Sequence, residues 1–308
     1  MGDFDSSRVN LMEPATIPPI SKAPDPFNTE DFQLNWARTD PEQRLGFRGG
    51  RFTSVNKPLS FLAGLLLTVL FYAVVIFGLQ RIPRADWFRA MFLERGICPY
   101  PTMLFFFWAL AILYFKSRKL DMQSEALRLS AVPQQPDFEL TPTTARQVLE
   151  RIHSLVDHPT HFILLNRIER ALSNLKNIGQ VSDVSNILKT QADYDEEQIT
   201  SSYSLVNGFV WAIPVLGFIG TVLGLSQAIS AFGLTLQAGG DLSGIKQSLQ
   251  GVTAGLATAF ETTLIALVAA LIVQLLMTYM QSREGEFLDA CNDYCHAHVA
   301  AKLRLGGE

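Results

Sequence analysis

The sequence is poor in charge and in cysteine for a chain of its length. Of its 308 residues, 18% are Asp, Glu, Lys or Arg, 48% are apolar and three are cysteines. Three cysteines cannot form a disulfide framework, and a net charge of -4 without a long basic run argues against nucleic acid as a partner. Low charge together with a positive mean hydropathy excludes an ordinary soluble protein and predicts a membrane protein with soluble parts.

The short motifs of enzyme active sites are also missing. The sequence contains no nucleophile elbow, no phosphate-binding loop, no HExxH and no paired carboxylates in a soluble pocket. We therefore expect neither an enzyme nor a bound cofactor.

Residues 1–57 lack the leading apolar run of a secretory signal and contain six prolines. We expect a flexible cytoplasmic arm, extended or mobile over most of its length, with room for a short helix at 29–36. The Arg48-Gly-Gly-Arg51 cluster could suggest nucleic-acid binding, but a basic collar at the lipid headgroups is the better interpretation.

The sequence contains long apolar runs. Residues 59–79 form a run of 21 residues without a charge, enough to cross roughly 30 Å of hydrocarbon. We expect four transmembrane helices, at 59–79, 99–115, 204–233 and 250–280. A short amphipathic helix at 86–94 is expected to lie at the interface between the first two.

The remaining segments are polar and helical in pattern. We expect residues 116–203 to form a cytoplasmic helical domain, with a first helix beginning at Thr141-Pro142 and a last one running without interruption into the third span. Residues 281–308 are expected to be a cytoplasmic tail, helical as far as Gly306-Gly307. The predicted fold is an all-α membrane protein with four spans, a helical domain between spans 2 and 3, and long helices extending into the cytoplasm.

Basic residues near the spans predict the orientation. With the amino terminus inside, nine lie on the inner flanks and five outside, which favours cytoplasmic termini. The inner ones are Arg44, Arg48, Arg51, Lys57, Lys116, Arg118, Lys119, Arg128 and Arg283, and the outer ones are Arg81, Arg84, Arg89, Arg95 and Lys246.

The third and fourth spans each carry a stripe of small residues with one threonine on it. In the third span the stripe steps by three and four residues, and in the fourth by four. Because lipid offers no hydrophobic drive between helices, such a stripe predicts close approach of another helix, with the threonines in the middle of the seam. The stripes are Pro214, Gly217, Thr221, Gly224, Ala228 and Ala231, and Gly251, Gly255, Ala259 and Thr263.

These two stretches resemble a known family. Pro214-Val-Leu-Gly217-Phe-Ile-Gly220-Thr221-Val-Leu-Gly224 is similar to the PxLGxxGTVxG stretch of the MotA/TolQ/ExbB family, and Ala259-Phe-Glu-Thr-Thr263-Leu-Ile-Ala-Leu resembles its later ALxxTAxGL stretch. Four spans with a large domain after the second resemble the MotA branch in layout.

The resemblance implies a function, a location and partners. Members couple proton or sodium flow across the bacterial inner membrane to mechanical work. The chain would form a homo-oligomer, a pentameric ring, around two copies of a single-span MotB/TolR/ExbD-like partner that carries a membrane aspartate. Hydroxyls on the seams would then line the ion pathway; the candidates are Thr221, Thr263, Thr262 and Thr258.

Glu261 is a further candidate, because a charge inside the bilayer costs about 3 kcal/mol or more. An acid commonly stands five residues before the threonine in the TolQ/ExbB branch, and that position is Thr258 here. Glu261 and Thr263 are two residues apart, hence roughly 160° apart around the helix. Both cannot face one narrow pore. We expect Thr263 and Thr221 to line it and Glu261 to face a neighbouring helix, with the reverse arrangement left open.

Other interpretations compete with an ion channel. Either threonine could simply bond a carbonyl one turn earlier, and the chain could be a non-conducting oligomeric scaffold that docks a cytoplasmic partner. Two His and Cys groups have partial metal-ligand spacing, but neither supplies a complete site, so no metal is expected. The groups are His153, His158 and His161, and Cys291, Cys295 and His298.

Overall fold

A computed structural model describes most of the chain after residue 39. The described residues are 40–44, 46–47, 49–78, 80, 86–129, 131–133, 135, 138–173, 175, 181–237 and 242–304. They lie in one unit, 31–308. The helix expected at 29–36 and Arg48 of the basic cluster fall outside the described residues.

Four helical stretches are long and apolar enough to cross a membrane: Lys57–Gly78, Pro99–Arg128, Ser182–Gly233 and Ile245–Ala300. In the described part of the chain every regular element is a helix, apart from an isolated bridge between Leu140 and Leu303. The prediction of an all-helical, four-span chain is confirmed at this level, and the protein is a multi-pass membrane protein.

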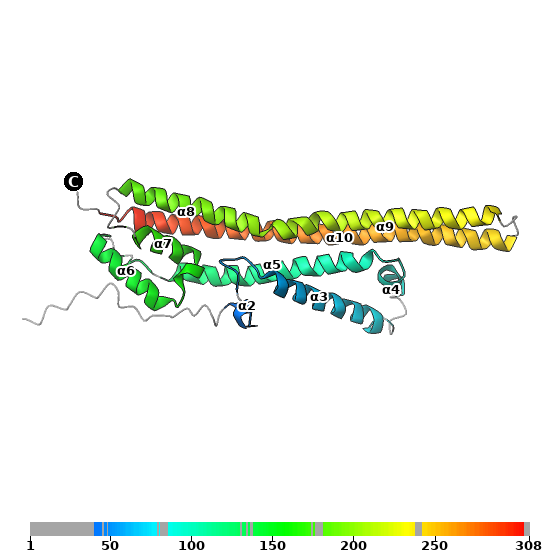
Figure 1. Cartoon of the computed structure of the whole chain (residues 1–308), viewed down its shortest axis with the longest axis horizontal. Coiled ribbons are helices and arrows are strands. Elements are labelled where there is room, and N and C mark those ends of the chain that lie inside the picture. Colours follow the sequence, from blue (N-terminus) through cyan, green and yellow to red (C-terminus); the bar gives the residue numbers. More distant parts are fainter. Residues whose placement is uncertain are drawn as a thin grey trace, which may run out of the picture. The chain divides into compact units, whose positions relative to one another are not determined.

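The first two spans form a hairpin. Helix α3 (Lys57–Ala73) continues as a π-helical turn, η1 (Val74–Gly78), and packs against α5 (Pro99–Arg128), as Figure 1 shows. The two backbones touch at Gly64, where an added Cβ would lie 2.6 Å from Trp108 Cα. The short helix expected at 86–94 is present as α4 (Asp86–Leu93), and its Met91 and Phe92 pack into the apolar cluster that joins η1 to α5.

A short helix, α2 (Pro41–Arg44), and three elements between the second and third spans complete the polar part: α6 (Pro142–Leu155), η3 (Pro159–His161) and α7 (Ile163–Ser173). Thr141 caps α6 as expected, because its side chain accepts the backbone N–H of Thr144 and the Thr144 side chain accepts the N–H of Thr141. The core here consists of fully buried aliphatic residues from α6 and α7, including Val148, Ile152 and Ile168.

The longest helices are α8 (Val181–Ser202), α9 (Ser204–Gln237) and α10 (Leu242–Cys295), followed by a π-helical turn, η4 (His296–Ala300). In Figure 1, α9 and α10 run side by side as an antiparallel hairpin. Two predictions were wrong here. The helix into the third span is interrupted at Tyr203, and the tail helix ends near Ala300, where the chain turns so that Leu303 pairs with Leu140. In both places tertiary contacts override a helical sequence that contains no breaker.

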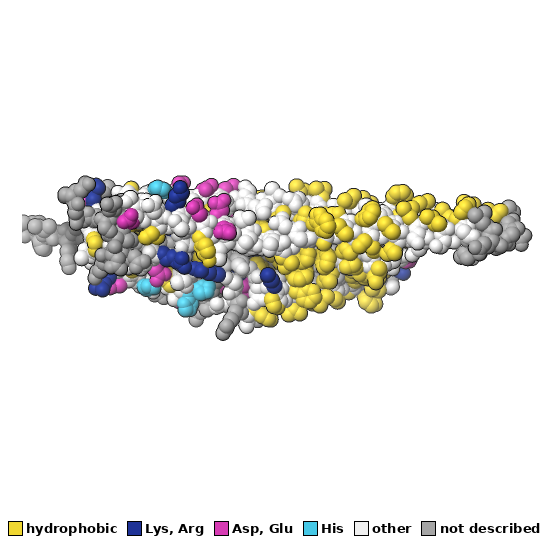
Figure 2. Space-filling view, turned by 45° about the horizontal axis from the view of Figure 1, so that its top comes forward, with side chains coloured by type: hydrophobic (Ala, Val, Ile, Leu, Met, Phe, Trp, Pro, Cys, Tyr) yellow, Lys and Arg dark blue, Asp and Glu magenta, His cyan; other side chains and the backbone are white. Residues whose placement is uncertain are grey.

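Apolar and charged side chains separate along the molecule. Figure 2 shows hydrophobic side chains gathered over the spans and charged ones over the helical domain. Many large apolar residues of α9 and α10 are more than half exposed, including Trp211, Phe218, Ile229, Phe260 and Leu271. An exposed apolar surface of this extent belongs against lipid or another protein chain.

Candidate functional site

Helices α9 and α10 meet along a seam of small residues. At its centre a Cβ on Gly224 would lie 2.6 Å from the Gly255 carbonyl oxygen, and a Cβ on Gly255 would lie 2.6 Å from the Gly224 carbonyl oxygen. The seam extends to Gly251, where an added Cβ would lie 2.7 Å from Ala231 Cβ. The backbones are therefore in direct contact, which any larger side chain would prevent.

Gly220 and Thr262 face each other on this seam. A Cβ added to Gly220 would lie 2.7 Å from Thr262 Cβ, so the absence of a side chain at Gly220 makes room for Thr262. Thr262 is buried and donates to the carbonyl of Thr258, 2.8 Å away, in its own helix. Thr258 in turn donates to the Ala254 carbonyl at 3.0 Å. Both hydroxyls are thus satisfied within α10.

Thr263 is the threonine that reaches across the seam. Its Oγ1 lies 3.1 Å from the Gly217 carbonyl oxygen of α9 and 3.2 Å from the Ala259 carbonyl oxygen of α10. The hydroxyl can donate to either oxygen, so it can exchange an intrahelical bond for an interhelical one without leaving its place.

Thr221 does not lie in the middle of the seam, contrary to expectation. It is half-buried and donates to the Phe218 carbonyl at 2.6 Å. The buried contact positions of α9 are instead Ile213, Gly217, Gly220, Gly224 and Ala228. Gly220 occupies the contact point, and the next residue is turned by about 100° to the side of the seam. Pro214 is half-buried inside α9, which continues through it.

Glu261 pairs with a basic residue from outside the hairpin. Its Oε2 accepts from Arg95 Nε at 2.7 Å and its Oε1 from Arg95 Nη2 at 3.3 Å; the Glu261 side chain is 15% exposed. Arg95 lies in the loop between α4 and α5, so Glu261 stands level with the beginning of α5 rather than with its middle. Glu261 faces α4 and α5 while Thr263 faces α9.

Residues 157–292 match the profile of the MotA/TolQ/ExbB proton channel family. Over these residues the chain is similar to that family. The match includes α7 to α9 and α10 as far as Asn292, and therefore both helices of the seam. No curated protein and no solved structure matches the chain.

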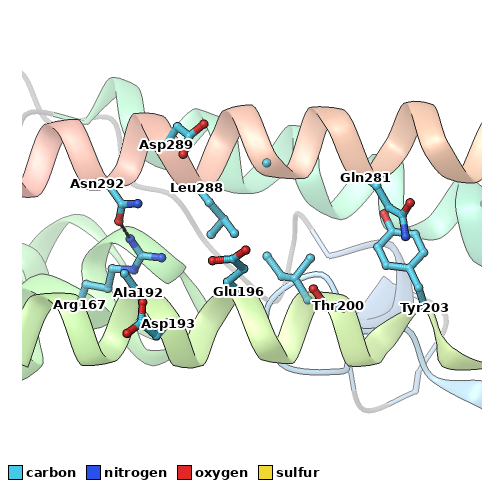
Figure 3. A pocket seen from close by; sticks show the side chains of 12 residues that line it. Arg167, Ala192, Asp193, Glu196, Thr200, Tyr203, Gln281, Leu288, Asp289 and Asn292 are labelled. Carbon is cyan, nitrogen blue, oxygen red and sulfur yellow. Dashed lines mark hydrogen bonds between the residues drawn. The ribbon is translucent and has the colours of Figure 1, made fainter.

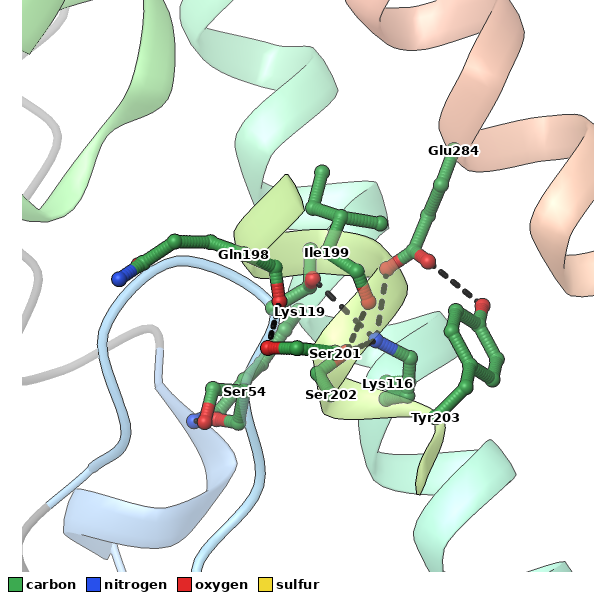
Figure 4. A network of polar contacts seen from close by, with 10 residues as sticks. Ser54, Lys116, Lys119, Gln198, Ile199, Ser201, Ser202, Tyr203 and Glu284 are labelled. Atoms are coloured by element: carbon green, nitrogen blue, oxygen red, sulfur yellow. Dashed lines mark hydrogen bonds and ion pairs between the residues drawn. The ribbon is translucent and has the colours of Figure 1, made fainter. Parts of the chain in front are cut away.

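The family region is joined to α5 by a buried polar network at the Tyr203 interruption (Figure 4). Lys116 Nζ of α5 lies 3.0 Å from Glu284 Oε1 of α10, and the Tyr203 hydroxyl donates to Glu284 Oε2 at 2.5 Å. Lys116 also lies 4.2 Å from the centre of the Tyr203 ring and donates to Ser202 Oγ at 2.8 Å. These contacts hold Tyr203 out of the helical path and explain the interruption.

A second buried pair fixes the end of the amino-terminal arm to α5. Lys119 Nζ donates to Glu42 Oε2 at 2.6 Å and to the Ser54 carbonyl at 2.7 Å, and both charged side chains are fully buried. Glu42 also accepts the backbone N–H groups of Gly50 and Asn56, at 3.0 and 2.7 Å. The expectation of an extended or mobile arm therefore does not hold for the described residues between 40 and 57.

A cleft of about 380 Å³ lies between α8 and α10, beside this network. Figure 3 shows Arg167 of α7 pointing into it. Arg167 Nε donates to Asp195 at 2.6 Å and Nη1 to Asn292 at 2.5 Å, while Nη2 has no hydrogen-bond partner. Three exposed acids, Asp193, Glu196 and Asp289, line the cleft.

The candidate metal ligands are dispersed. Across the described ranges no three His, Cys, Asp or Glu side chains are grouped closely enough to hold a metal ion. His153 lies 3.5 Å from Glu169, and the rings of His158 and His161 are 5.8 Å apart. Cys291 and Cys295 are buried free thiols, and the ring of His298 packs 4.7 Å from that of Tyr294.

Sequence reasoning missed the charged partners of these sites. Arg95 was counted only as an outer charge, and Lys116 only as an inner one. Arg167 was not singled out. A weak signal existed for Lys116 and Glu284, because each is among the first charges after an apolar span on the same predicted side of the membrane.

Proposed function

We propose that this protein is the pore-forming subunit of an ion-driven motor in the bacterial inner membrane. It couples the passage of protons, or of sodium, to rotation of a ring or to force on a single-span partner. The termini and the domain at 116–203 face the cytoplasm. Five copies surround two partner helices, each with a membrane aspartate. The family match and the four spans support this proposal.

One observation carries the proposal: the Thr263 hydroxyl on the glycine seam, within reach of carbonyls from two helices. A hydroxyl can pass a proton, or replace part of the water shell of a sodium ion, without itself becoming charged. Thr221, half-buried beside the seam, offers a second hydroxyl. In the ring, these groups meet the partner's aspartate, which is neutralised and recharged as ions pass, and each cycle advances the ring by one step.

Ion flux in vesicles that contain this protein and its partner tests the proposal. Replacing both Thr221 and Thr263 by valine keeps the side-chain shape but removes the hydroxyls. We expect flux to fall by at least about tenfold, because two hydrogen-bonding groups are lost, each worth about 1 kcal/mol, and about 1.4 kcal/mol corresponds to a factor of ten. Replacing both by serine, which keeps the hydroxyls, is the control and is expected to retain most of the flux. Unchanged flux in the valine variant would exclude a pore role for these residues.

A non-conducting scaffold is the second candidate. The close contacts of Gly220 with Thr262 and of Gly224 with Gly255 favour a seam that serves packing alone. On that hypothesis Thr221→Val is harmless, whereas Gly220→Leu prevents assembly. The valine and serine variants distinguish the two functions, because the scaffold predicts the same behaviour for both.

A further inference from the structure

We propose that the cleft between α8 and α10 binds a short basic peptide segment, the stretch of the single-span partner that precedes its transmembrane helix. The inference rests on the proposed function for the identity of the partner. The chemistry of the cleft is independent of that function.

The rim of the cleft is acidic and unpaired. Asp193 and Glu196 on α8 and Asp289 on α10 are exposed, and none of them forms an ion pair with a described residue. Exposed carboxylates on both walls attract a ligand with several positive charges. In Figure 2, acidic side chains gather on this part of the helical domain.

At the floor of the cleft, the Arg167 side chain has a hydrogen-bond donor without an acceptor. The Arg167 side chain is 1% exposed, is neutralised by Asp195, and keeps one terminal nitrogen, Nη2, without a partner. A buried donor without an acceptor is costly, about 1–3 kcal/mol. The positive charge of the buried Arg167 guanidinium also disfavours the binding of a metal cation in the cleft. A peptide satisfies both requirements, because its backbone carbonyls accept from Arg167 while its Lys or Arg side chains reach the acids.

The position of the cleft suits a chain that has just left the membrane. One end is lined by Tyr203 and Gln281, next to the Lys116–Glu284 network, and the other end lies at Ala192 and Asn292. From Tyr203 to Ala192 the cleft follows α8 for about 16 Å, the length of about five extended residues. The cytoplasmic flank of a single-span helix is typically rich in Lys and Arg. The first residues of such a flank therefore match the cleft in length and in charge.

Binding of a labelled peptide to the full-length protein in nanodiscs tests this directly. The probe is a fluorescein-labelled 12-residue peptide of alternating Lys and Ala, followed by fluorescence anisotropy. We expect binding that weakens as salt is raised, and an affinity about tenfold lower for Asp193→Asn/Glu196→Gln/Asp289→Asn, since three exposed pairs are lost. The variant Glu125→Gln/Glu150→Gln/Asp183→Asn removes as many exposed charges away from the cleft and is expected to bind like the wild type.

Three results would overturn the proposal: equal affinity for both triple variants, equal binding of a Glu–Ala peptide, or complete displacement by millimolar Mg²⁺ at constant ionic strength, which would indicate a cation site. A photo-crosslinker at Thr200 should label the basic peptide, whereas one at Glu150 should not. Ion flux separates this inference from the proposed function. Flux without peptide binding refutes the docking site alone. Peptide binding without flux refutes the channel, and with it the identity of the partner, but not the basic-peptide site.

Discussion

Gly220 is a residue at which the seam between α9 and α10 has no room for a side chain. Its substitution by alanine would place a Cβ 2.7 Å from Thr262 Cβ, closer than side-chain carbons approach in folded proteins. We expect Gly220→Ala to destabilise the protein by about 1–3 kcal/mol, the range for over-packing. The midpoint of thermal unfolding in detergent, followed by circular dichroism, measures the loss.

Gly208 is the matched control in the same helix. No atom lies within 4 Å of a Cβ added there, so Gly208→Ala should leave the midpoint unchanged or raise it, because alanine favours helix over glycine. Similar midpoints for the two variants would show that α9 and α10 do not touch at Gly220.

The Arg95–Glu261 pair allows the two roles of Glu261 to be separated. If the pair only anchors α10 to the α4–α5 loop, Arg95→Gln and Glu261→Gln lower stability by similar amounts, and the double variant shows a coupling energy of about 0.5–3 kcal/mol. Because the structure pairs both carboxylate oxygens with Arg95, this anchoring result is the one we expect. Unfolding midpoints of the four proteins complete the cycle.

Ion flux measured with the same four proteins can contradict the anchoring role of Glu261. If Glu261 carries ions, Glu261→Gln and the double variant lose flux, while Arg95→Gln keeps it. Loss of flux limited to the variants without Glu261 would contradict the anchoring role and place the carboxylate in the ion pathway.

Among the elements, the segment at 40–57, which we call the strap, is held to α5 by the buried ion pair between Glu42 and Lys119. Glu42→Gln leaves Lys119 buried without its counter-ion, and breaking such a pair costs about 3–5 kcal/mol. Detaching the segment exposes Lys119 to water at a smaller cost than unfolding the molecule. We therefore expect trypsin to cleave after Arg51 at least about tenfold faster in this variant, as measured by mass spectrometry of timed digests.

Glu139→Gln is the control for the strap. It breaks an ion pair with Arg304 whose side chains are 64% and 70% exposed, so it should not change cleavage at Arg51. If Glu42→Gln instead lowered the unfolding midpoint of the whole protein without faster cleavage, the segment would be an inseparable part of the core.

The elements also show which parts of the fold can be predicted from the sequence. The start of α6 at Pro142 and that of α5 at Pro99 follow from local signals, proline at the first helical position and, for α6, a capping threonine. The interruption at Tyr203 has no such signal, because it depends on Lys116 and Glu284, which are 87 and 81 residues away in the sequence.

The candidate site divides in the same way. The small-residue stripes predicted that another helix would approach α9 and α10 closely, because only small residues allow backbones into contact. Spacing could not decide between Gly220 and Thr221, since neighbouring residues differ by about 100° and the crossing of the helices selects one of them. The Arg95–Glu261 pair joins residues 166 positions apart, for which one sequence offers no signal.

At the scale of the whole molecule, the family match stops short of the first hairpin. Residues 157–292 contain the seam, the cleft and Glu261, whereas α3, α5 and the strap lie outside them. Lys116 and Arg95 connect the two parts near opposite ends of the spans, through Glu284 and Glu261. The Arg95–Glu261 pair lies near the beginning of α5, and the Lys116–Glu284 pair lies further along it. The side of the membrane on which each pair lies can therefore be tested separately.

The proposed orientation places the α4–α5 loop outside and the helical domain inside. In a variant whose three buried cysteines are replaced by alanine, we would introduce one cysteine at a time, at Glu94 beside that loop or at Ser154 on α6, both exposed positions. A membrane-impermeant maleimide added to intact spheroplasts should label Glu94→Cys, and should label Ser154→Cys only after permeabilisation. The reverse pattern would invert the topology, put the acidic cleft outside the cell, and separate it from the basic flank that it is proposed to bind.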